Sequence, residues 1–151
     1  MKKCMLPGLL FLVLAISGPL FGQTAAKLEA LLETPVLTWA EVSVFVQEAA
    51  QTPLAADNTP AGQQWLPKGV SSGDSARLNG VALLLMRSFD LKGGIFFKIA
   101  KSPHHAYREL VYKKVIRGKT DPDMLVSGPD LLLMVNRLLA MTENTGGHQN
   151  D

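Results

Sequence analysis

The sequence predicts an all-α fold made of three helix–loop–helix units. Three observations carry this prediction: apolar residues recur at helical spacing, helix-capping residues precede several of these runs, and the pattern of one unit recurs in the next. A repeated unit of this kind is more typical of an array that binds something than of an enzyme.

The first 22 residues resemble an export signal. Lys2 and Lys3 provide a positive start, and the apolar run Leu9–Ile16 follows. This run is too short to cross a bilayer, which needs about 20 residues. We expect cleavage after Gly22, with cleavage after Ala25 or retention as a membrane anchor as alternatives. The mature form would then be exported to the periplasm or cell envelope and would have no transmembrane helix.

Removal of this segment changes the charge balance. The chain has 15 Lys+Arg and 13 Asp+Glu, and loss of Lys2 and Lys3 leaves 13 of each. A formally neutral protein gives no reason to expect nucleic acid as a partner. Cys4, the only cysteine, would also be lost, so the mature form can hold no disulfide. Cys4 precedes the apolar run, which is the wrong place for a lipoprotein cysteine.

The first unit combines a short helix over residues 24–33 with a second over residues 38–51. Thr38 and Glu41 have the spacing of a capping box, in which each residue bonds the backbone of the other. Apolar residues then recur at i, i+3, i+4 and i+7 and predict one buried face of the second helix. They are Val42, Phe45, Val46 and Ala49.

The second unit is less regular. Residues 52–62 are rich in turn-forming residues, and a short helix is expected at about residues 59–66. A helix over residues 75–89, capped by Asp74 or Ser75, would follow. The apolar run 95–97 after two glycines remains unassigned.

The third unit begins at Ser102, a helix cap followed by Pro103, and predicts a helix over residues 103–116 that ends near Gly118. The last helix is expected over residues 127–141, with Ser127 as its cap. The helical domain would cover residues 23–141, and the polar tail, residues 142–151, is expected to be disordered.

The units match at fixed offsets. An offset of 50 aligns Val81 with Leu131 and Arg87 with Arg137, and an offset of 39 aligns the first unit with the second. Chance agreement between amphipathic helices is the alternative explanation.

The third unit resembles an S-layer homology (SLH) repeat. The residues that carry the resemblance are the turn 114–122 (KVIRGKTDP) and the helix start 126–130 (VSGPD), with LTWAE at 37–41 and ARLNG at 76–80 as the matching helix starts. The resemblance covers most of residues 24–141. It implies a pseudo-threefold arrangement of the three units. It also implies non-covalent binding of a cell-wall polysaccharide or a peptidoglycan-linked polymer in grooves between them.

The sequence departs from the family pattern at its binding positions. The family's arginine falls at Trp39, Leu78 and Gly128, and its acidic residue is retained only as Glu41 and Asp130. Both acids are also residues that a helix N-terminus favours, so we expect a structural role for them. The resemblance thus supports the fold more strongly than the ligand.

The clearest candidate binding feature is positive charge. Eight basic residues and a single acid, Glu109, lie between Lys92 and Lys119. Such a field attracts anionic polymers or phospholipid head groups, unless it is only a solvated helix face. The candidate binding residues are Lys113, Lys114, Arg117, Lys119 and Arg108.

No catalytic residues are predicted. The mature chain has no cysteine, no Gly-x-Ser-x-Gly motif and no phosphate-binding glycine loop. His105 and Glu109 share a helix face but are too few to hold a metal, so we expect no metal or cofactor. Trp39 and Trp65 would either pack in the core or stack on a sugar.

The sequence therefore predicts an exported, non-enzymatic cell-envelope protein with an SLH-like module that binds wall polymer. The alternative is a periplasmic scaffold that has lost polymer binding and docks an envelope protein. A small glycan hydrolase is a third, less supported reading.

Overall fold

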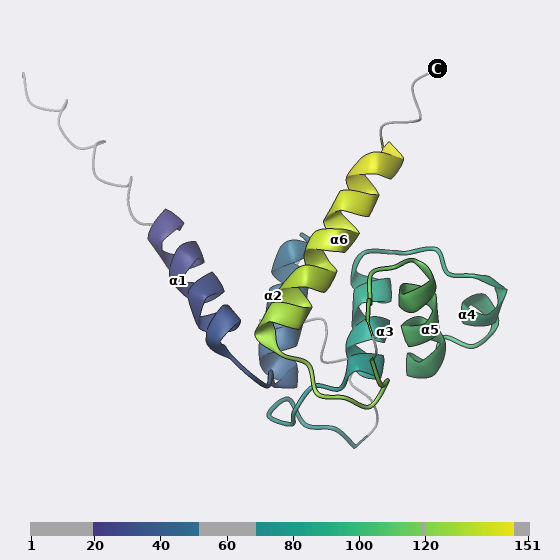
Figure 1. The fold of residues 1–151 in the computed structure, drawn as a ribbon, viewed down its shortest axis with the longest axis horizontal. Coiled ribbons are helices and arrows are strands. Elements are labelled where there is room, and N and C mark those ends of the chain that lie inside the picture. The colour runs from purple at the N-terminus through teal and green to yellow at the C-terminus, as the bar shows by residue number, and fades with distance from the viewer. Residues whose placement is uncertain (1–19, 52–68, 119, 147–151) are drawn as a thin grey trace, which may run out of the picture.

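The computed structural model describes residues 20–51, 69–118 and 120–146 (Figure 1). These residues are mainly helical and include no strand, which confirms the all-α fold class. The helices are α1 (Leu20–Glu33), α2 (Trp39–Ala49), α3 (Leu78–Ser88), α4 (Ile95–Ile99), α5 (Pro103–Tyr112) and α6 (Gly128–Gly146).

A closed ring of backbone hydrogen bonds joins the segments that precede α2, α3 and α6. The N–H of Leu37 donates to the carbonyl of Val126 at 2.9 Å, Val126 donates to Ala76 at 3.0 Å, and Ala76 donates to Leu37 at 2.8 Å. All three residues are buried. Because each stands just before a helix, three helix starts meet at one point in the interior.

A second set of bonds extends this ring by two residues along each chain segment. In each case the first residue of a helix donates its N–H to the carbonyl of a neighbouring segment. The pairs are Trp39 to Asp74 at 3.0 Å, Leu78 to Met124 at 2.9 Å, and Gly128 to Thr34 at 2.9 Å. First-turn amides have no acceptor within their own helix, so these contacts satisfy groups that would otherwise be unpaired.

α2 and α3 begin and end at positions that lie 39 residues apart in the sequence. Both helices have 11 residues, and their N-caps are Thr38 and Arg77. Each is followed by a residue in the left-handed conformation, Gln51 with φ 52° and Asp90 with φ 45°. The same start and stop positions therefore recur in the backbone of the first two units.

Packing between helices forms one apolar core. α3 lies against α5, α1 against α6, α2 against both α3 and α6, and α4 against α5 (Figure 1). α3 is the most enclosed helix, with every residue from Gly80 to Met86 buried. Leu85, Leu110 and Leu138 are among the largest fully buried side chains and come from α3, α5 and α6.

The start of α3 differs from the prediction. Neither Asp74 nor Ser75 caps it, since its N-cap is Arg77, which makes no side-chain cap bond. The first two amides of α3 donate instead to the carbonyls of Met124 and Pro122. A distant loop thus replaces the local cap, and the Asp74 carboxylate accepts from the N–H of Ser71 at 2.7 Å.

The end of α5 also differs. This helix stops at Tyr112, before the expected residue 116, and its left-handed residue is Lys114 with φ 60°. The N–H of Lys114 donates to Val111 at 3.0 Å and that of Val115 to Leu110 at 2.9 Å, the bond pair of a Schellman motif. The turn buries Val115 and leaves Val111 exposed.

Several boundaries shift at the ends of the described ranges. α1 begins at Leu20 rather than residue 24, and α6 continues to Gly146, beyond the expected end at residue 141. Residues 142–146, which the sequence predicted to be disordered, therefore belong to the last helix. The helix expected at 59–66, most of the export signal and residues 147–151 lie outside the described residues. Within the described ranges, no helix has the length and apolar character needed to cross a membrane.

Candidate functional site

Glu41 and Asp130, the two acids that the SLH resemblance aligns, both act at helix starts. The Thr38 N–H donates to the Glu41 carboxylate at 2.8 Å, and the Glu41 N–H donates to the Thr38 hydroxyl at 3.4 Å. The expected capping box is therefore present. At α6 the Asp130 N–H donates to the Ser127 hydroxyl at 3.3 Å, and that hydroxyl donates to the Asp130 carboxylate at 2.6 Å.

The three positions at which the SLH resemblance would place an arginine lie in the interior. Trp39 and Leu78 are buried core residues. A Cβ added at Gly128 would overlap the carbonyl oxygen of Leu31, so a side chain could be placed there only if the backbone moved. A binding surface on this protein must therefore be formed by other residues.

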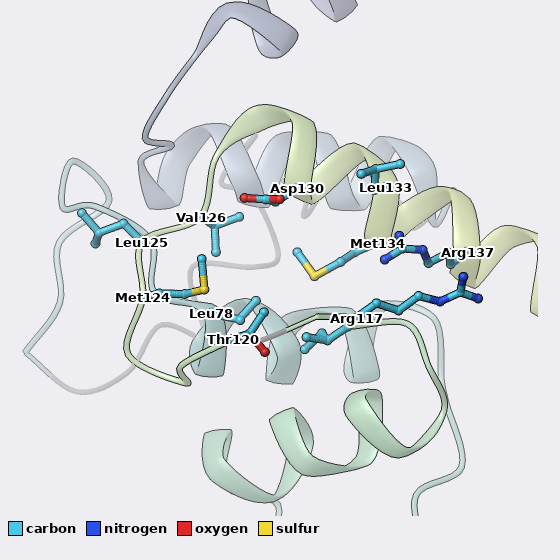
Figure 2. Close-up of a pocket in the computed structure, with 11 residues that line it drawn as sticks. Leu78, Arg117, Thr120, Met124, Leu125, Val126, Asp130, Leu133, Met134 and Arg137 are labelled. Atoms are coloured by element: carbon cyan, nitrogen blue, oxygen red, sulfur yellow. The ribbon is translucent and has the colours of Figure 1, made fainter.

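One candidate is a hollow of about 120 Å³ between the start of α3, the loop after α5 and the first half of α6. We call it the arginine hollow. Figure 2 shows its lining, with Arg117 and Arg137 at one end and apolar side chains, Thr120 and Asp130 along the rest. The residues that line it are Leu78, Ile116, Arg117, Thr120, Met124, Leu125, Val126, Asp130, Leu133, Met134 and Arg137.

A more open hollow of about 200 Å³ shares Arg117 and Arg137 with the arginine hollow. Its other lining residues are Lys113, Lys114, Ala140 and Met141. The two hollows meet at the arginine pair, and four basic side chains surround the second.

Both arginines are fixed by backbone carbonyls of the turn that follows α5. Arg117 donates from Nε to the carbonyl of Lys114 at 2.8 Å, and Arg137 donates from a terminal guanidinium nitrogen to the carbonyl of Val115 at 2.8 Å. Figure 2 shows the Arg117 side chain extending from the loop toward the part of α6 that carries Arg137. The remaining guanidinium N–H groups are oriented by these contacts.

Within the described residues, neither arginine forms an ion pair with a carboxylate. The ion pairs among the described residues join Lys27 to Glu48 and Lys113 to Glu109, each at 3.4 Å. Neither pair involves Arg117 or Arg137. Asp130 also lines the arginine hollow, but its carboxylate accepts a hydrogen bond from Ser127 at 2.6 Å. Two adjacent, oriented guanidinium groups that form no ion pair favour an anion, which they can bind through charge-assisted hydrogen bonds.

The structure brings together some of the predicted binding residues. Lys113, Lys114 and Arg117 line the second hollow, although Lys113 is paired with Glu109. Arg108 is exposed on α5 and lines neither hollow, and Lys119 lies outside the described residues.

Arg137 is a functional candidate that the sequence analysis used only to align two units. It is the only charged residue between Leu131 and Met141, an otherwise largely apolar stretch. An isolated charge within a helix that packs in the core was the available signal, because such a residue needs a polar contact. That contact is the carbonyl of Val115.

Two other candidates, His105 and Trp39, make contacts typical of structural residues. His105 lies 2.7 Å through Nδ1 from the hydroxyl of the cap residue Ser102, and no cluster of three or more potential metal ligands occurs in the described ranges. Trp39 packs in the core, while Trp65 lies outside the described residues.

Comparisons with protein-family models, curated proteins and solved structures found no match for this chain.

Proposed function

We propose that this protein is an exported, non-enzymatic module of the cell envelope with three SLH-like units in a pseudo-threefold arrangement. It binds an anionic cell-wall polysaccharide or peptidoglycan-linked polymer. Its binding residues are Arg117 and Arg137, with Lys114 beside them. It acts in the periplasm or at the cell envelope, after removal of residues 1–22.

The hydrogen-bond ring supports the three-unit arrangement. Leu37, Ala76 and Val126 are the residues that the SLH resemblance aligns with one another, and they are also the residues that bond in a closed cycle. Donors and acceptors occupy equivalent positions around this cycle. A pseudo-threefold axis through the ring accounts for both facts.

The arginine pair is the observation that carries the binding proposal. Two guanidinium groups are held by backbone carbonyls, line two adjoining hollows and have no carboxylate partner among the described residues. Such a site favours carboxylate or phosphate groups, which occur along anionic wall polymers. The site also replaces the family's arginine positions, where Trp39, Leu78 and Gly128 leave no basic side chain.

A pull-down of the exported protein with purified cell-wall material tests the proposal. We expect the retained fraction to fall as salt rises, and Arg117→Gln with Arg137→Gln to weaken binding about tenfold, the loss of roughly one charged hydrogen bond. The matched control is Arg77→Gln with Arg108→Gln, which removes the same charge elsewhere. Equal retention of the arginine-pair variant and this control would contradict the assignment.

A second candidate is docking of an envelope protein. It is favoured by the apolar side chains beside the arginine hollow, because Met124, Leu125 and Leu133 are all partly exposed there. No retention on wall material, together with one protein that co-purifies with the parent chain but not with Leu133→Ser, would support this candidate instead.

A further inference from the structure

Phe97 is the buried residue among the described side chains of α4. Phe97 is only 7% exposed, and α4 packs on α5. Gly93 provides the space for its ring, since a Cβ at Gly93 would lie 2.5 Å from Cδ1 of Phe97. This contact fixes which face of the short helix points inward.

The opposite face of α4 is apolar and exposed. Ile95 and Ile99 are four residues apart and share one side of the helix, while Phe97 lies on the other side. Their exposed fractions are 72% and 80%, the highest of the large aliphatic side chains in the described part of the chain. Figure 1 shows α4 at the outer edge of the fold, beyond α5.

Lysines predominate around this face, although the carboxylate of Glu109 on α5 lies beside Gly94 at the start of α4. Lys92, Lys98 and Lys101 are all exposed, and residues 91–101 contain no acidic residue. Lysine side chains can extend their ammonium groups to lipid head groups while their methylene chains lie along an apolar surface. Exposed aliphatic residues flanked by lysines are the features of a helix that lies in the interface of an anionic membrane.

We propose that α4 docks the protein on the surface of an anionic phospholipid bilayer. We call the five residues Lys92, Ile95, Lys98, Ile99 and Lys101 the α4 face. Ile95 and Ile99 enter the boundary between head groups and acyl chains, and the lysines contact the lipid phosphates. A hydrated wall polymer would use the lysines but would gain little from two exposed isoleucines, so a lipid surface fits the α4 face better.

This inference does not depend on the proposed polymer binding, because the two use different residues. The α4 face contains neither Arg117 nor Arg137. Variants of one surface should therefore leave binding at the other unchanged, and the two proposals can fail separately.

The test is co-sedimentation of the exported protein with vesicles. Its N-terminus is sequenced first, so that only protein lacking the apolar run Leu9–Ile16 is used. We expect binding to vesicles of equal parts phosphatidylcholine and phosphatidylglycerol, little binding to phosphatidylcholine alone, and weaker binding at higher salt. Ile95→Ser with Ile99→Ser should lower the partition coefficient at least about tenfold.

The control variant is Leu32→Ser with Val44→Ser, which removes two other exposed aliphatic side chains and should bind vesicles like the parent. Lys98→Glu with Lys101→Glu keeps both isoleucines and should also lose binding to the anionic vesicles. Circular dichroism establishes that each variant remains helical. Unchanged partition of the isoleucine variant would overturn the proposal. Equal binding of the parent to neutral and anionic vesicles would also overturn it. So would an isoleucine variant that loses wall-polymer binding but keeps vesicle binding.

Discussion

The backbone N–H of Val126 donates to the carbonyl oxygen of Ala76 at 3.0 Å, although 50 positions separate the two residues in the sequence. The same interval aligns the apolar residues of α3 and α6. The offset of 50 that relates the two units in the sequence is thus also the separation of two residues that pair through their backbones just before α3 and α6.

Gly128 is a position where a single methyl group should destabilise the fold. Gly128→Ala places a Cβ against the carbonyl oxygen of Leu31, so α1 and the start of α6 must move apart. We expect the free energy of unfolding to fall by about 2–3 kcal/mol, as in other overpacked sites. Urea denaturation measures this change. Gly73→Ala is the control, because nothing lies within 4 Å of the added atom, and equal effects of the two changes would contradict the prediction.

The capping box of α2 should contribute measurably to stability. Thr38→Ala removes the hydroxyl that accepts from the Glu41 N–H and should cost about 1 kcal/mol in the free energy of unfolding. Thr38→Ser retains the hydroxyl and should cost much less. Thermal and urea denaturation of both variants compare them, and an alanine variant as stable as the serine variant would show that the cap contributes nothing.

Asp90 ends α3 in a conformation that favours glycine. Its φ of 45° lies in the left-handed region, where a Cβ crowds the backbone. Asp90→Gly should therefore raise the free energy of unfolding by about 0.5–1 kcal/mol, whereas Asp90→Ala keeps the strain and should not. A glycine variant less stable than the alanine variant would argue against backbone strain at this position.

Glu109 limits the positive charge near the proposed polymer site. Its carboxylate lies 3.4 Å from Nζ of Lys113, and both side chains are largely buried. Glu109→Gln removes this partner, so Lys113 can contribute to anion binding. We expect wall-polymer retention to rise about two- to threefold with a steeper dependence on salt. Retention below that of the parent in a folded variant would contradict a role for charge at this site.

Features that depend on neighbouring residues in the chain could be predicted from the sequence. The capping box at Thr38 and the cap at Ser102 involve residues three positions apart, and both are present. The start of α3 could not be predicted in this way. Its first amides donate to the carbonyls of Pro122 and Met124, more than 40 positions away, so no local cap is needed.

One part of the candidate site could likewise be predicted from neighbouring residues, and the other part could not. Lys113, Lys114 and Arg117 stand close together in the sequence, and their local charge density identified them. Arg137 joins them only because α5 ends in a left-handed turn at Lys114, which turns the carbonyl of Val115 toward α6. The burial of Trp39 and the absence of space at Gly128 likewise depend on packing between units.

The hydrogen-bond ring has a consequence for how the chain acquires its structure. A chain shortened before Val126 would leave the N–H of Leu37 and the carbonyl of Ala76 without partners in the interior, at a cost of about 1–3 kcal/mol for each group. The first two units therefore cannot complete their core while the third is still being synthesised. We therefore expect folding to the native state to be a late event in synthesis, after the third unit has been made.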